Sequence, residues 1–373
     1  MTLLRLSLGA LLALALPHTS VFTAQDSPAL RSIQKFQRGV NLGNYLEAPP
    51  KQNWGAKYSA EDFKHIREEG FDHVRLPIAW HHFAGEAPKF ALSDEIYSKA
   101  DFLVTNALRE KLSVIVNIHH FDAFTSDPEG QKEKFYALWR QIAAHYSKTP
   151  DTVAFELLNE PKDAATTAVM NPIYAEAIKI IRASNPNRTI FVGPGRWNQA
   201  IELANLRLPD QDQNLIVTIH CYEPFHFTHQ SASWAGPDVK ALKGIVFPGP
   251  PTQPFTPPEG VTLTKGASNW VHRYNTLPTE ENPSSPNAFR KSLQLAKDWS
   301  LKNNRPIHVG EFGCYIRADV DSRQRFHTEF KKALDEMGFA FAMWDWKAGF
   351  RYWDDTAKKP APGMREAMFG QRR

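Results

Sequence analysis

The sequence has few cysteines and no large excess of charge of either sign. Cys221 and Cys314 are the two cysteines among 373 residues, which excludes a disulfide-rich scaffold. One bridge between them is geometrically possible, but we expect two free thiols. The 44 basic and 40 acidic residues give a net charge of +4. Because the basic residues are scattered and are not interleaved with aromatic residues, we expect no nucleic-acid partner.

Motifs typical of metal-dependent hydrolases and of serine hydrolases are also absent from the sequence. The chain has no His-Glu-x-x-His segment of the kind found in zinc hydrolases, and no Gly-x-Ser-x-Gly segment that would present a nucleophilic serine. A barrel amidohydrolase would need two histidines on one strand face, and the adjacent His119 and His120 cannot both point inward. We therefore expect neither a metal ion nor an organic cofactor.

Long hydrophobic runs are missing, apart from a short one near the N-terminus. The segment from Leu6 to Leu16 is mainly apolar, follows Arg5 and ends at Pro17. It is too short to span a bilayer, and the pattern is typical of a signal peptide. We predict a signal peptide over residues 1–24, with cleavage near residues 20–26, and a catalytic domain over residues 25–373. A buried N-terminal helix is the alternative. The expected location is secreted or periplasmic, without membrane contact after the signal is removed.

What the sequence does contain is a regular alternation of apolar runs and amphipathic segments. The apolar runs cover residues 38–42, 73–80, 113–120, 153–161, 189–195, 215–222, 306–315 and 339–346. Alternating strands and helices indicate a parallel sheet, and eight such units fit a closed (β/α)8 TIM barrel. A doubly wound open sheet is the alternative, although no glycine-rich fingerprint follows the first run.

One segment departs from this alternation. Residues 248–286 hold nine of the 27 prolines and show little helical periodicity. We predict an extended loop after the sixth strand, on the face of the barrel that carries the active site. Such loops are often lids or binding walls, and a passive surface excursion is the alternative. No internal repeat or linker is visible, so we expect a single domain.

Polar residues gather where the predicted strands end, which in a parallel barrel is the face that carries active sites. Arg75 lies inside the second strand, and the others follow strands three to eight: His119, His120, Asn159, Glu160, His220, Tyr222, Glu311 and Trp344. Glu160 and Glu311 follow the fourth and seventh strands, which face each other across a barrel. Two opposed carboxylates suit glycosidic-bond cleavage, because one protonates the leaving oxygen while the other attacks the sugar carbon or activates water.

Seven ordered segments carry a resemblance to a known family. They are RGVNLGN, VRLPIAW, VNIHH, LLNEP, IHCYEPFHFTHQ, GEFG and MWDWK. In this order they resemble glycoside hydrolase family 5, the family of cellulases and related β-glycanases, over nearly the whole mature chain. The resemblance implies a retaining mechanism with Glu160 as general acid/base and Glu311 as nucleophile.

The resemblance also implies roles for the other strand-end residues. Asn159 would bind the 2-hydroxyl of the reacting sugar, and Arg75 would keep the nucleophile ionised. Tyr222 would orient Glu311, and His220 would lie beside the acid/base. His119 matches the third-strand histidine of the family, and His120 is a second candidate. Trp344 would be the platform on which a sugar ring packs. Arg75 could instead pair with a helix carboxylate. His119 and His120 could be core histidines, and Tyr222 could be a core residue whose hydroxyl bonds to the backbone.

Aromatic residues follow several predicted strands and indicate a groove for a polymer. Trp80 and Phe83 follow the second strand, Trp197 and Asn198 follow the fifth, and residues 225–234 follow the sixth. We expect a monomeric endo-acting enzyme on a β-glucan-type polysaccharide, with β-1,4-glucan as first choice. Mannan, xyloglucan and β-1,3-glucan stay open. So do an exo-acting β-glucosidase or transglycosylase and a non-catalytic carbohydrate-binding barrel.

Overall fold

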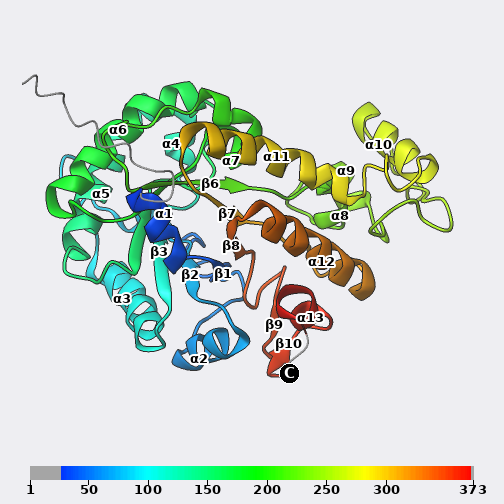
Figure 1. Cartoon of the computed structure of the whole chain (residues 1–373), viewed down its shortest axis with the longest axis horizontal. Helices are drawn as coiled ribbons and strands as arrows, with labels where there is room; N and C mark the ends of the chain where they lie inside the picture. Colours follow the sequence, from blue (N-terminus) through cyan, green and yellow to red (C-terminus); the bar gives the residue numbers. More distant parts are fainter. Residues whose placement is uncertain (1–26, 371–373) are drawn as a thin grey trace, which may run out of the picture.

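Eight parallel strands form a closed barrel in sequence order, and β8 pairs with β1 to complete the ring. The computed structural model describes residues 27–370, so the signal peptide predicted for residues 1–24 lies outside the described residues. Helices surround the strands (Figure 1). The (β/α)8 barrel is thereby confirmed as a single domain, and the open-sheet alternative is wrong.

Every predicted strand is present, but each is shorter than the apolar run from which it was predicted. The strands are β1 (Arg38–Asn41), β2 (His73–Leu76), β3 (Ser113–Asn117), β4 (Val153–Glu156), β5 (Ile190–Val192), β6 (Leu215–His220), β7 (Ile307–Glu311) and β8 (Ala340–Met343). From β2 to β8 every strand residue is buried, since helices cover the outside and side chains fill the inside. Most of the polar residues that end the apolar runs therefore lie in loops just beyond the strands.

The helices that cover the barrel begin and end at capping residues. The longer ones are α2 (Ala60–Glu69), α3 (Asp94–Arg109), α5 (Pro128–His145), α6 (Thr167–Ser184), α11 (Pro286–Asn303) and α12 (Val320–Met337). Ser59 and Asp62 form a capping box at the start of α2, and Gly70 ends that helix in a left-handed conformation. Asp319 caps α12 by accepting a hydrogen bond from the Ser322 backbone amide.

Short elements occupy the loops and the chain ends. They are α1 (Pro28–Ser32), η1 (Ile33–Lys35), η2 (Trp80–Phe83), α4 (Asp122–Ser126), α7 (Gly195–Asn198), η3 (Ala200–Asn205), α8 (Phe225–Thr228), α9 (Pro237–Ala241), β9 (Trp353–Asp354), β10 (Lys359–Pro360) and α13 (Met364–Phe369). β9 and β10 form a separate antiparallel pair.

The N-terminal end of the barrel is closed by α1 and η1. Ala29, Ile33 and Phe36 form a buried cluster with side chains from inside the barrel, among them Phe191. The ring of Phe36 contacts the rings of His73 at 5.6 Å and Phe191 at 5.4 Å, both edge to face. With this end filled, only the C-terminal end of the strands is open to a substrate.

The predicted loop over residues 248–286 contains a helix, α10 (Lys265–Thr276), which corrects the expectation of a structureless segment. Ala267, Val271 and Tyr274 recur at helical spacing and are buried, and Thr264 caps the first turn. Trp270 stacks on His226 of α8 at 4.8 Å, which joins α10 to the loop that follows β6. In Figure 1 the helix projects to one side of the barrel, beyond α8 and α9.

Two further findings bear on the sequence expectations. Cys221 and Cys314 are free, buried thiols, as expected. Over residues 27–370, every helix falls short of the length and apolar character needed to cross a bilayer.

Candidate active site

The strand-end carboxylates meet at the C-terminal end of the barrel. One oxygen each of Glu160 and Glu311 and one ring nitrogen of His220 all lie within 4.8 Å of one another. Glu160 follows β4 with a left-handed backbone at φ 46°, a conformation that non-glycine residues adopt rarely and mostly at functional sites. Glu311 is the last residue of β7. This separation suits the direct attack of one carboxylate on a sugar carbon, for which about 5 Å is typical.

Arg75 of β2 lies at the centre of the hydrogen bonds in the site. Its guanidinium donates to Glu156 at 2.6 and 2.7 Å, to Glu311 at 2.7 Å, and to the amide oxygens of Asn41 and Asn159 at 2.8 Å each. Burial acts to lower the pKa of Arg75, but Glu156 and Glu311 outweigh it and the pKa lies above its ordinary value. The guanidinium is therefore a permanent positive charge beneath the two carboxylates.

Glu156 and Asn41 are site residues that the sequence analysis missed. Glu156 is fully buried in β4 and holds two nitrogens of Arg75, and Asn41 ends β1 and binds a third. Glu156 interrupts an otherwise apolar strand, and a buried arginine needs such a partner. A charged residue within an apolar strand was therefore the sequence pattern from which Glu156 could have been identified as a site residue.

The two catalytic candidates have different surroundings. Burial raises the pKa of Glu160 to about 7, although Arg75 and Lys162 act to lower it. Its side chain is 24% exposed, so solvent moderates the effect. Burial also raises the pKa of Glu311, while His220 and Arg75 act to lower it. Glu311 accepts hydrogen bonds directly from Arg75 and from the Tyr222 hydroxyl at 2.9 Å, whereas the contact of Glu160 is with His220 at 2.9 Å. The hydrogen bonds from Arg75 and Tyr222 therefore favour the anion of Glu311, whereas burial favours the protonated form of Glu160.

The predicted aromatic platform lies next to the third-strand histidine. Trp344, just after β8, is half-buried and parallel to the His119 ring at 5.8 Å. Gly43 lets the indole approach the backbone, since a Cβ there would lie 2.8 Å from it. His120 is exposed, and its ring contacts the rings of His119 at 4.3 Å and Trp54 at 5.9 Å, both at steep angles. The structure thus brings His119 and Trp344 together and leaves His120 on the rim.

The aromatic residues that were predicted to line a groove divide into two groups. Trp80 is fully buried and donates to the Asn117 carbonyl, so it packs inside the molecule. In contrast, Trp197 is 47% exposed and Trp234 is 61% exposed, in loops that follow β5 and β6. Trp54, which the sequence analysis did not single out, is 39% exposed after β1. Three exposed indoles thus surround the open end of the barrel.

The cluster of Glu160, His220 and Glu311 is also the one group among residues 27–370 that is compact enough to hold a metal ion. Its oxygens already have other partners, however. Arg75 and Tyr222 occupy both oxygens of Glu311, and a metal cation would be repelled by the guanidinium 2.7 Å from the same carboxylate. The donor set therefore fits a pair of carboxylates that act directly rather than a metal centre.

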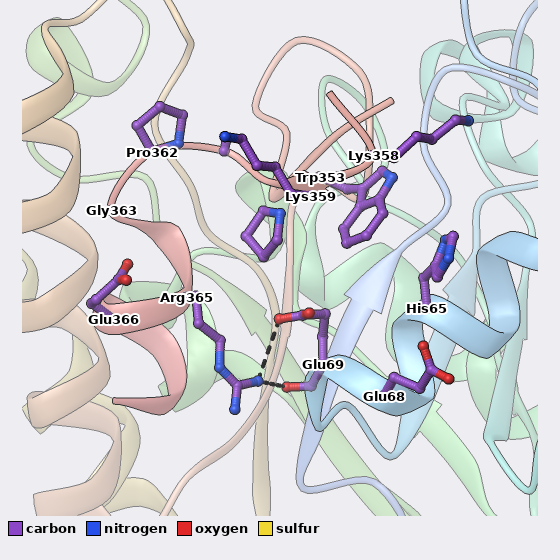
Figure 2. Close-up of a pocket in the computed structure, with 12 residues that line it drawn as sticks. His65, Glu68, Glu69, Trp353, Lys358, Lys359, Pro362, Gly363, Arg365 and Glu366 are labelled. Atoms are coloured by element: carbon purple, nitrogen blue, oxygen red, sulfur yellow. Dashed lines mark hydrogen bonds and ion pairs between the residues drawn. The ribbon is translucent and has the colours of Figure 1, made fainter. Parts of the chain in front are cut away.

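A second pocket lies away from these residues. It measures about 580 Å³ and is lined by α2, the β9–β10 hairpin and α13 (Figure 2). Glu69 and Arg365 contact each other at 3.3 Å on one wall. The ring of Trp353 is covered by His65 at 4.6 Å on one side and Trp346 at 5.2 Å on the other. No indole face is left free there for a sugar, and neither Glu160 nor Glu311 lines this pocket.

Two facing carboxylates at the ends of β4 and β7 of a (β/α)8 barrel define a glycoside hydrolase. The family model described as Cellulase (glycosyl hydrolase family 5) matches residues 33–349, so the chain belongs to this family.

Several known proteins are similar to this one over most of the chain. Endoglucanase H of Acetivibrio thermocellus is 28% identical over 84% of this chain, which spans 30% of that relative. Endoglucanase C of the same organism is 27% identical over 84% of this chain and 91% of its own length. Cel5A of Thermotoga maritima, solved in complex with mannotriose and with cellobiose, is 33% identical with a TM-score of 0.77 and covers 91% of this chain and 100% of its own.

Proposed function

We propose that the protein is a secreted endo-β-1,4-glucanase that cleaves its substrate with retention of configuration. The observation that carries the proposal is the placement of Glu160 and Glu311 within 4.8 Å, in surroundings that favour a proton on the first and a charge on the second. The names of the relatives support a glucan as substrate, and a solved neighbour that is 30% identical and described as an endo-β-1,4-glucanase supports the 1,4 linkage. The exposed indoles around the barrel mouth support binding of a polymer. Secretion rests on the pattern of residues 1–24.

In the first step Glu160 donates its proton to the glycosidic oxygen while Glu311 attacks the sugar carbon. Arg75 and Tyr222 hold both oxygens of Glu311, so the nucleophile is oriented before the substrate arrives. In the second step Glu160, now a carboxylate, takes a proton from water, which displaces Glu311. Asn159, fixed by Arg75, is placed to bind the 2-hydroxyl of the sugar in the glycosyl subsite. Trp344 is the platform beneath this sugar ring.

A β-mannan is the second candidate substrate, because the Cel5A neighbour is described in complex with mannotriose as well as cellobiose. The reacting carboxylates are the same for both polymers. The choice between them rests on loop residues around the groove.

The test is a panel of polysaccharides assayed for viscosity and for reducing sugar. A rapid fall in viscosity with few reducing ends is expected on soluble β-1,4-glucan, and NMR of the first products should show the β-anomer. Glu160→Gln should lower turnover about 10²–10⁴-fold, and Glu311→Gln should abolish it. Glu95→Gln, an exposed ion-pair variant, serves as the control.

Other outcomes would redirect the proposal. Release of glucose or cellobiose from chain ends alone would mean exo action, and α-anomers would exclude the retaining mechanism. Binding of oligosaccharide without any release of reducing ends would make the barrel a non-catalytic binding protein.

A further inference from the structure

Asn198 lies behind the candidate acid/base and takes no part in the mechanism described above. It is the last residue of α7, is fully buried, and adopts a left-handed backbone at φ 57°. Gly193 makes room for its amide, since a Cβ at Gly193 would lie 2.6 Å from it. The backbone amide of Trp197 donates to the Pro161 carbonyl at 3.0 Å, which ties α7 to the loop that carries Glu160.

The imidazole of His220 bridges Asn198 and the acid/base. Nδ1 lies 2.9 Å from an oxygen of Glu160 and 3.6 Å from an oxygen of Glu311. On the other side of the ring, Nε2 lies 3.4 Å from the amide nitrogen of Asn198. The amide oxygen of Asn198 is buried and has no hydrogen-bond partner within the described part of the chain. Among the described residues, the hydrogen-bond partner of the Asn198 amide group is therefore the His220 ring.

The neighbours of His220 decide where its single proton lies. Two carboxyl oxygens face Nδ1, so a proton is favoured there. Nε2 then presents a lone pair, and the amide of Asn198 is oriented to donate to it. A donor at this place also opposes a second proton on the ring, because an N–H on Nε2 would point at another N–H. Burial lowers the pKa of His220 to about 4, which agrees with a neutral ring.

We propose that Asn198 is a positioning residue that holds His220 in the Nδ1–H tautomer, so that the proton of Glu160 stays on the oxygen that faces the leaving group. The proposal rests on the proposed role of Glu160. With Nδ1–H donating to one oxygen of Glu160, that oxygen serves as an acceptor in both protonation states. The catalytic proton then resides on the other oxygen, and His220 needs no proton transfer of its own during the reaction.

The variant Asn198→Asp reverses this arrangement with little change in shape. A carboxylate beside Nε2 accepts an N–H, so His220 becomes imidazolium and stabilises the carboxylate form of Glu160. The other charged groups around the ring are unchanged: Glu160, Glu311, Arg75, Glu156, His119 and His308. The alkaline limb of the pH profile of kcat/KM should therefore move about one unit toward lower pH.

The leaving group separates this effect from a general loss of structure. With the pKa of Glu160 moved from about 7 by one unit, Asn198→Asp should lower kcat/KM about fivefold at pH 7 and about ninefold at pH 8 for an aryl cellobioside that needs a proton to depart. For a dinitrophenyl cellobioside, which departs without one, the change should be under threefold. Equal losses with both substrates, or an unshifted pH profile, would overturn the proposal. A Glu160→Gln variant that shows no such dependence on the leaving group would instead overturn the role of Glu160.

A second measurement does not depend on whether Asn198→Asp folds. In ¹⁵N-histidine NMR of the wild-type protein, the signals absent from a His220→Gln variant identify His220. We expect Nδ1 to carry the proton and Nε2 to show the shift of an unprotonated nitrogen. The opposite tautomer would overturn the proposal.

Discussion

At the scale of single residues, the site depends on one buried cation shared by two carboxylates. Arg75 is fully buried and contacts Glu156 and Glu311. The two carboxylates differ in what they face: Glu156 is enclosed by the barrel, whereas Glu311 is 6% exposed and lies beside Glu160. Glu156 thus fixes the position of the Arg75 guanidinium, which also donates a hydrogen bond to Glu311.

Removing Glu156 should therefore weaken the whole molecule. Loss of one partner of a buried ion pair costs about 3–5 kcal/mol, because it leaves a buried charge poorly compensated. We expect Glu156→Ala to lower the free energy of unfolding in urea by about this amount and to reduce activity through a displaced Arg75. Glu95→Ala, which removes an exposed pair with Lys99, should change it by less than about 0.5 kcal/mol. A loss below about 1 kcal/mol for Glu156→Ala would contradict this account.

Residue-level reasoning from the sequence located most of the cluster but not its support. Polar residues at strand ends were visible, because they stand out where an apolar run stops. Glu156 lies within such a run. Asn198 was named as a groove residue after the fifth strand, but it is fully buried in a turn whose left-handed backbone no sequence pattern predicted. Their importance comes from partners brought from other strands.

At the scale of elements, α1 and η1 act as a plug for the end of the barrel opposite the active site. Phe36 is fully buried and is the large side chain of that plug. It contacts His73 of β2 and Phe191 of β5, so it links separate strands of the ring.

The variant Phe36→Ala tests the role of the plug. Truncation of a buried phenylalanine costs about 3–5 kcal/mol through lost burial and the cavity left behind. We expect thermal unfolding at a clearly lower temperature, with kcat/KM nearly unchanged while the protein is folded, since the site is at the opposite end. A variant with unchanged Tm, or one that is fully folded but inactive, would show that the plug has another role. Leu301→Ala, at an exposed position of α11, is the matched control.

Element-level prediction worked for the barrel and failed for α10. Strands and outer helices were predicted because short apolar runs, typical of strands buried on both faces, alternate with amphipathic segments of helical period. The strands end earlier than the apolar runs because pairing stops where the ring opens into loops. The helix α10 was missed because the prolines around it suggested a loop, although its own twelve residues contain none.

At the scale of the whole molecule, many buried histidines make stability depend on pH. Burial lowers the pKa of His81, His229 and His327 to about 3. A histidine with an ordinary pKa near 6.5 in the unfolded chain binds a proton there before it does so in the fold. Stability from these groups is therefore complete above about pH 6.5 and is lost as pH falls toward 3. Glu47, with a pKa raised to about 7, acts in the opposite direction between about 4.5 and 7.

A single substitution isolates one of these contributions. His327 is fully buried and its Nε2 has no hydrogen-bond partner among residues 27–370. Between pH 7.5 and pH 5, we expect His327→Gln to gain about 2 kcal/mol in stability relative to wild type, since it lacks the proton uptake of the unfolded histidine. His272→Gln, at an exposed position, is the matched control. Urea unfolding at both pH values is the measurement, and parallel losses for wild type and His327→Gln would contradict the expectation.

The two thiols have a practical consequence for following motion at the catalytic end of the barrel. Cys221 and Cys314 are fully buried just past β6 and β7, one residue from His220 and three from Glu311. A thiol reagent can reach them only when these strand ends separate. The rate of chemical labelling with and without an oligosaccharide thus reports how often the unmodified enzyme opens beside Glu311, the proposed nucleophile, without any engineered probe.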